Sequence, residues 1–197
     1  MPELLWPATA MLVLFIGIGA YDGLYLHLWR FRLFARPESR REHLTHTLRA
    51  LLVLPTIVLL FIVNSQGWLL YLALGLALLD FAVMIWDVLT EEGSRADFGG
   101  LPQGEYLIHL VGTTLHVTAL TLAFASRPMQ AWLPSASVVG PAPVPEIIST
   151  TAWAVLPGAA LVGLLHVILL HPAFLAYNPK ESRPEATAAS QAVAAGN

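Results

Sequence analysis

Hydrophobic runs separated by short polar segments divide the chain into five stretches that are long enough to cross a membrane. A helix that spans a bilayer needs about 20 predominantly apolar residues. The pattern predicts an all-α, polytopic membrane protein in which the first four helices form an antiparallel bundle and the fifth packs against it. The expected spans are residues 4–28, 48–63, 68–89, 106–124 and 152–170 of a single transmembrane domain, residues 1–178, and residues 179–197 are expected to be a disordered cytoplasmic tail.

Composition and the distribution of basic residues agree with this interpretation. Charged residues make up 12% of the 197 positions, whereas soluble domains carry about 25%. Nine of the ten Lys and Arg residues lie on one side of the predicted spans, and only Arg127 lies on the other. By the positive-inside rule the basic side is cytoplasmic. We therefore expect a multi-pass protein of the inner (cytoplasmic) membrane with its N-terminus outside and its C-terminus in the cytoplasm.

Several classes of function are disfavoured by what the sequence lacks. The chain contains no cysteine, which excludes disulfides, thiolate metal ligands and cysteine nucleophiles. It contains no Walker motif, Rossmann glycine pattern or nucleophile elbow. The first apolar run has no basic segment before it and no cleavage site after it, so we interpret it as a retained span. The arginines of the first loop are explained by topology, and we expect no nucleic-acid partner.

The third and fourth predicted helices carry matched polar stripes. The stripes consist of Glu91, Asp87 and Asp80 on the third helix and of Glu105, His109 and His116 on the fourth. Each set is spaced by four and then seven residues, so at about 100° per residue its members share one face of the helix. Because consecutive helices are antiparallel, we expect Asp87 to face His109 and Asp80 to face His116.

The first two predicted helices add ionisable groups to the same, cytoplasmic half of the membrane. Asp22 and His27 lie towards the inner end of the first helix, and Glu42 and His46 lie at the inner start of the second, with Arg49 one turn deeper. The outer half carries almost none. Ionisable residues inside a bilayer are costly and mark functional sites by default. Imidazole and carboxylate ligands suit iron, zinc or manganese, so the sequence predicts a metal site.

The predicted ligands come from four helices and provide both kinds of donor. They are Asp22, His27, Glu42, His46, Asp80, Asp87, Glu105, His109 and His116. In its ligand inventory the set resembles ferritin-like di-iron carboxylate proteins, although the spacing here is Glu-x-x-x-His and the bundle is transmembrane. We expect an integral membrane metalloprotein with one or two divalent ions, iron being favoured over zinc or manganese. We expect an enzyme that acts on a lipid-like or other apolar substrate, an oxidoreductase in preference to a hydrolase.

Some of these residues also have simpler interpretations. Glu42 is suitably placed to close a capping box with Ser39. Glu105 fits the positive end of its helix dipole. Asp87 is a suitable buried ion-pair partner for Arg49 across the hairpin of the second and third helices.

The same polar residues are compatible with two sites of a different kind. A haem b electron-transfer subunit would use His27 or His166 together with His116. A cofactor-free proton or ion relay would use the polar groups without a metal. Asp22 and His27 are five residues apart, about 140° around an α-helix, which predicts that only one of them faces the site. The sequence does not decide whether the chain works alone, as an oligomer or as a subunit of a membrane complex.

Overall fold

The computed structural model describes residues 2–96 and 99–175, so the predicted tail from residue 179 onwards lies outside the described residues. Five helices in the described part are long and apolar enough to cross a membrane, which confirms the predicted all-helical class. They are α1 (Leu5–Ala20) continued by the π-helix η2 (Tyr21–Arg30), α2 (Arg40–Ile57) continued by the π-helix η4 (Val58–Ile62), α3 (Gly67–Ser94), α4 (Gln103–Ala125) and α5 (Glu146–Leu169). Short 3-10 turns are η1 (Pro2–Leu4), η3 (Leu33–Ala35), η6 (Met129–Trp132) and η7 (Pro172–Phe174).

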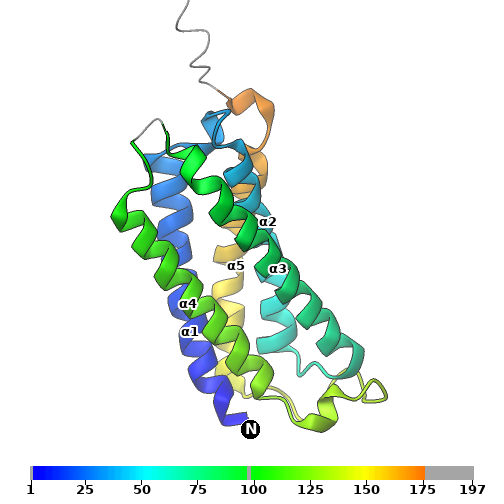
Figure 1. Ribbon diagram of the computed structural model, residues 1–197. Helices are drawn as coiled ribbons and strands as arrows, with labels where there is room; N and C mark the ends of the chain where they lie inside the picture. Colours follow the sequence, from blue (N-terminus) through cyan, green and yellow to red (C-terminus); the bar gives the residue numbers. More distant parts are fainter. Residues whose placement is uncertain (1, 97–98, 176–197) are drawn as a thin grey trace, which may run out of the picture.

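The helices are arranged as two antiparallel pairs with α5 between them. α1 packs against α4, α2 packs against α3, and α5 contacts both α1 and α2 (Figure 1). Consecutive helices alternate in direction, so α1, α3 and α5 run towards the end of the bundle that holds residues 30–41 and Arg95 (Figure 1). We call this the arginine-rich end. The opposite end holds the turn between α2 and α3 and the segment 126–145.

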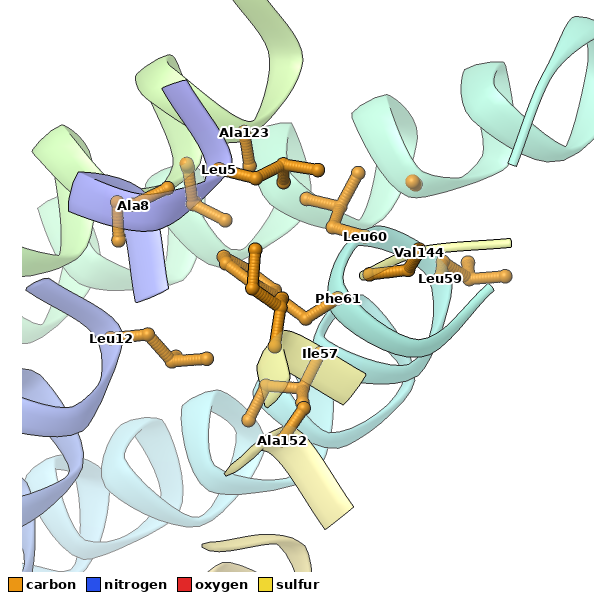
Figure 2. Close-up of a cluster of buried hydrophobic side chains, with 14 of the residues drawn as sticks. Leu5, Ala8, Leu12, Ile57, Leu59, Leu60, Phe61, Ala123, Val144 and Ala152 are labelled. Carbon is orange, nitrogen blue, oxygen red and sulfur yellow. The ribbon is translucent and has the colours of Figure 1, made fainter. Parts of the chain in front are cut away.

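Apolar side chains fill the half of the bundle next to the opposite end. Leu60 and Phe61 of η4 are at most 1% exposed and meet Leu5 and Ala8 of α1 and Ala152 of α5 (Figure 2). Close van der Waals packing is what holds helices together in an apolar solvent, where burial alone gives little driving force. This packed, dry half leaves the interior near the arginine-rich end as the place where polar groups gather.

The segment 126–145 closes the opposite end. It contains little regular structure, as its proline-rich sequence indicates, yet hydrogen bonds tie it to the bundle. The guanidinium of Arg127 donates to the side chain of Asn64 and, at 2.6 Å, to the carbonyl of Leu60. The hydroxyl of Tyr71 donates to the carbonyl of Trp132 at 2.6 Å. Burial lowers the pKa of the Arg127 guanidinium. The hydrogen bonds to Asn64 and to the carbonyl of Leu60 stabilise its charged form.

Candidate metal centre

A change of helix type brings Asp22 and His27 to the same face. Residues Tyr21–Arg30 form a π-helix, which ends with the N–H of Phe31 donating to the carbonyl of Leu26, five residues earlier, at 2.9 Å. Residues five apart lie nearly above one another in this geometry, whereas they diverge in an α-helix. Asp22 Oδ1 is accordingly 3.4 Å from His27 Nε2. The expectation that only one of the two faces the site was wrong, because it assumed α-helical geometry.

His27 lies at the centre of a shell of carboxylates. Its side chain is 0% exposed, and oxygens of Asp22, Glu105 and Glu42 lie 3.4, 3.6 and 3.9 Å from its Nε2. Neither ring nitrogen makes a hydrogen bond within the described part of the chain. Buried polar atoms are nearly always satisfied, so each exception in a native structure calls for an explanation.

Two further imidazoles converge on His27 from other helices. The rings of His27 and His46 meet edge to face with centroids 4.0 Å apart, and the ring of His109 lies 5.6 Å from that of His27. His109 Nε2 is 3.2 Å from Asp22 Oδ1, and its Nδ1 is 3.0 Å from Glu91 Oε1. The imidazoles thus come from η2, α2 and α4, with carboxylates between them.

Two groups of side chains have ligand atoms close enough to share an ion. The groups are Asp22, His27 and His46, and His27, Glu105 and His109, and within each the ligand atoms all lie within 4.8 Å of one another. Ligand atoms held about 2.1 Å from a tetrahedral ion lie about 3.4 Å apart. The separations of 3.4 Å from Asp22 to His27 in the first group and of 3.6 Å from Glu105 to His27 in the second are close to that spacing. His27 belongs to both groups.

A buried arginine, Arg95, holds two carboxylates of the site in place. The guanidinium of Arg95 is 0% exposed and donates to both oxygens of Glu42, at 2.7 and 2.9 Å. It also donates to both oxygens of Glu105, from Nε at 3.2 Å and from a terminal nitrogen. The ring of Phe31 lies 4.7 Å below it. Burial alone lowers the pKa of Arg95, but the hydrogen bonds to Glu105 and the charge of Glu42 outweigh it and raise the pKa.

The sequence pattern does not reveal this role of Arg95, because a basic residue in the loop between two spans is expected from topology alone. The simpler interpretation of Glu42 as a capping residue does not match the structure. Among the described residues Ser39 makes no capping hydrogen bond to α2, and its hydroxyl instead donates to the carbonyl of Ser94 at 3.4 Å. Ser94 in turn donates from its own hydroxyl to Glu42. Glu105 does lie in the first turn of α4, but its carboxylate is engaged by Arg95.

A second polar cluster lies deeper in the bundle around Arg49. This guanidinium is 3.5 Å from oxygens of both Asp80 and Asp87. Asp87 also accepts a hydrogen bond from Thr45 and lies 3.2 Å from His46 Nε2. The simpler interpretation, in which Asp87 pairs with Arg49 across the α2–α3 hairpin, is therefore the arrangement found. His46 connects this cluster to the ligand groups around His27.

The two polar stripes of α3 and α4 face each other, but one of the two expected residue pairs differs from the prediction. Asp80 faces His116 as expected, with 3.6 Å between Oδ2 and Nδ1. His109, however, contacts Glu91, one helical turn from the expected partner Asp87. Two features explain the shift. Thr45 and His46 of α2 already contact Asp87, and α4 packs along α1. Asp80 and His116 belong to neither of the two candidate ligand groups within the described residues.

The charges of the whole region do not balance. Among the described residues, six carboxylates that are at most 8% exposed face two guanidinium groups, so four negative charges remain if the acids are ionised and the imidazoles are neutral. The carboxylates are those of Asp22, Glu42, Asp80, Asp87, Glu91 and Glu105, and the guanidinium groups are those of Arg49 and Arg95. Burying unpaired charge is expensive. Protons on the histidines or the carboxylates, or bound cations, must compensate, and two divalent ions would neutralise the excess.

A small cavity of about 60 Å³ opens beside these groups. It is lined by Asp22, His46, Arg49, Asp87, Glu91 and His109 together with apolar residues of α1, α3 and α4. Its volume suffices for a few water molecules or a partly hydrated ion. The fold and this interior define a helical protein capable of crossing a membrane, with a buried histidine–carboxylate cluster near one end.

Comparisons with known proteins assign no family to this chain: no family model, curated protein or solved structure matches it. Because folds host many functions, function must be argued from the site itself.

Proposed function

We propose that this chain is an integral membrane metalloprotein whose metal ion is held by Asp22, His27, His46 and His109. The observation that carries the proposal is His27, on which both candidate ligand groups converge. It is fully buried, and its ring nitrogens make no hydrogen bond among the described residues. Coordination would satisfy a buried imidazole nitrogen that lies near three carboxylates but makes no hydrogen bond to them.

The remaining predicted ligands take different places in the proposal. Glu105 completes the second ligand group, while Arg95 fixes its orientation and that of Glu42. Such outer-shell contacts orient ligands and tune metal affinity. Mixed imidazole and carboxylate donors favour iron, with zinc or manganese next in order. The unbalanced charge supports one or two divalent ions.

We further infer that the metal serves an enzyme acting on a lipid-like or other apolar molecule, an oxidoreductase in preference to a hydrolase. Support comes from the ligand types, since mixed histidine and carboxylate sites with open positions are used for O₂ chemistry and for water activation. The concentration of Arg at one end supports a cytoplasmic location for that end and an inner-membrane protein. Asp22, His27, His46 and His109 would then lie on the cytoplasmic side.

The test is the metal content of the detergent-purified full chain. Wild-type protein incubated with Fe²⁺, Zn²⁺ or Mn²⁺ and dialysed is expected to retain at least stoichiometric metal by elemental analysis. His109→Ala is expected to lower metal affinity by about 100-fold, because second-shell changes alone cost about 10- to 100-fold. His43→Ala is the matched control. His43 is a buried histidine of the same bundle, but it uses its Nε2 on the carbonyl of His166.

Metal content that is sub-stoichiometric in wild type, or equal in His109→Ala and His43→Ala, would contradict the proposal. An absorption spectrum of the same samples tests the haem b hypothesis, because a Soret band would indicate that the histidines bind haem and not a metal ion of the proposed kind. Conduction of protons by metal-free protein in vesicles would favour the relay.

His116→Leu separates the deeper cluster from the proposed centre. We expect unchanged metal content, since His116 pairs with Asp80 and packs on Phe15 with ring centroids 4.3 Å apart. The measurement is the number of ions bound per chain in wild type and variant. Loss of one of two ions would instead assign Asp80 and His116, which the sequence includes among the predicted ligands, to a second ion.

A further inference from the structure

A second and larger cavity lies between α1 with η2, α2 and α5. Its volume is about 500 Å³, and of the eighteen described residues that line it four are polar: Asp22, His46, Arg49 and His166. All four lie towards the arginine-rich end of their helices, whereas Phe15, Val53, Ala154 and other apolar residues line the rest. This volume and this apolar lining with a few convergent polar groups are typical of small-molecule sites.

Glycines make room for the cavity and also allow a close helix contact beside it. A methyl group placed on Gly158 or Gly19 would meet no described atom within 4 Å apart from the neighbouring backbone of its own helix, so the space beside these residues is open. At Gly23 the same methyl would lie 3.3 Å from His166 Nε2. The helices η2 and α5 therefore approach each other closely at Gly23, beside His166.

The cavity opens towards the outer surface of the bundle. Leu161 of α5 and Leu24 of η2 both line it and are 67% and 40% exposed. Both belong to helices apolar enough to cross a membrane, so this mouth would face the hydrocarbon of a bilayer. A ligand would then arrive from the lipid phase.

The polar end offers hydrogen-bond donors without a free positive charge. Arg49 is already 3.5 Å from both Asp80 and Asp87, and Asp22 is paired with His109. An anionic head group would therefore meet an environment with excess negative charge. Arg49 Nε lies 3.5 Å from Asp80 Oδ1 without making a hydrogen bond, and the buried Nδ1 of His166, a donor when it carries the ring proton, makes no hydrogen bond with the described residues. A neutral head group that accepts hydrogen bonds, such as a carbonyl, fits these donors.

We propose that this cavity binds a neutral amphiphile with a carbonyl head group, of the quinone type, drawn from the bilayer. Its apolar chain lies between α1, α2 and α5, and its head lies beside Arg49 and His166. Asp22 and His46 line both this cavity and the smaller one, so the head reaches the candidate metal centre. The role of the molecule as substrate rests on the proposed function, whereas its binding does not.

The test uses decyl-benzoquinone as the probe and the detergent-purified full chain, with affinity measured by isothermal titration calorimetry. Gly158→Leu places a side chain in the cavity and is expected to weaken binding by about tenfold or more. Gly17→Leu is the matched control. Gly17 also lies in a membrane-capable helix, has no atom within 4 Å of its added methyl position, and does not line the cavity. Its affinity is expected to equal that of wild type.

Decanoate is titrated in parallel as the anionic counterpart of the probe. The inference predicts quinone binding without decanoate binding, and decanoate binding as tight as quinone binding overturns it. Equal quinone affinity in Gly158→Leu and wild type also overturns it. Metal content of the same samples keeps the two proposals apart. Metal bound without quinone contradicts only this inference, whereas quinone bound without metal contradicts only the proposed metal centre.

Discussion

Arg95→Met is expected to destabilise the protein by about 3–5 kcal/mol, the usual cost of removing one partner from a buried ion pair. The guanidinium is the shared counter-ion of two fully buried carboxylates, Glu42 and Glu105. Without it both acids remain buried near Asp22, and their mutual repulsion opens this end of the bundle. Methionine fills a similar volume, so the loss measures charge rather than packing. Unfolding of purified protein in detergent, followed by circular dichroism, gives the difference in free energy.

Two comparisons identify the cause of that loss. Arg41→Met removes an exposed arginine from the same end of the bundle and is expected to leave stability within experimental error, because surface charges contribute little. Glu42→Gln and Glu105→Gln added to Arg95→Met remove the unpaired acids, and we expect most of the stability to return. If Arg95→Met were as stable as Arg41→Met, the ion pairs of Arg95 with Glu42 and Glu105 would not be what holds this end of the bundle together.

The part of the fold that the sequence predicted well is the part governed by composition. Each membrane-capable helix is visible as an apolar run, because a bilayer demands about 20 such residues regardless of what the helix contacts. The start of α2 at Arg40 shows the limit of that signal. The apolar run begins only at residue 48, because the first two turns of α2 are polar, and it is the pattern of Ser39 and Glu42 that predicts a helix start near Arg40. Those turns carry Glu42 and His46, whose side chains face the interior.

The sequence predicted which residues gather at the candidate site, but it did not predict all of their contacts. Helical spacing placed Asp80 opposite His116, because both helices are regular there. It failed for Asp22 and His27, where π-helical geometry replaces α-helical geometry. Nothing in the residues themselves indicates that change. Arg95 was missed for a different reason: positive charges at a membrane surface are expected on topology alone, and only tertiary structure shows which one is buried.

His27→Leu is expected to have opposite effects on the metal-free and the metal-loaded protein. In the metal-free protein a neutral His27, with the compensating protons on other groups of the cluster, makes no hydrogen bond to the described residues, so leucine removes an unsatisfied buried polar group, which costs about 1–3 kcal/mol where it occurs. The metal-free variant should therefore be as stable as wild type or more stable. With metal present the order reverses. A ligand at 100 times its dissociation constant stabilises the folded state by about 2.7 kcal/mol, and the variant loses this gain because both ligand groups include His27.

This reversal distinguishes a ligand from a structural histidine. An imidazole that merely stabilises the polar interior would make His27→Leu less stable under both conditions by a similar amount. A ligand makes the metal-induced gain vanish while the metal-free stability holds. Thermal unfolding of wild type and variant, each with chelator and with saturating metal, gives the four values required. A metal-induced gain of equal size in both proteins would remove His27 from the proposed centre. The charge imbalance around it would then have to be compensated by protons, as in a cofactor-free relay.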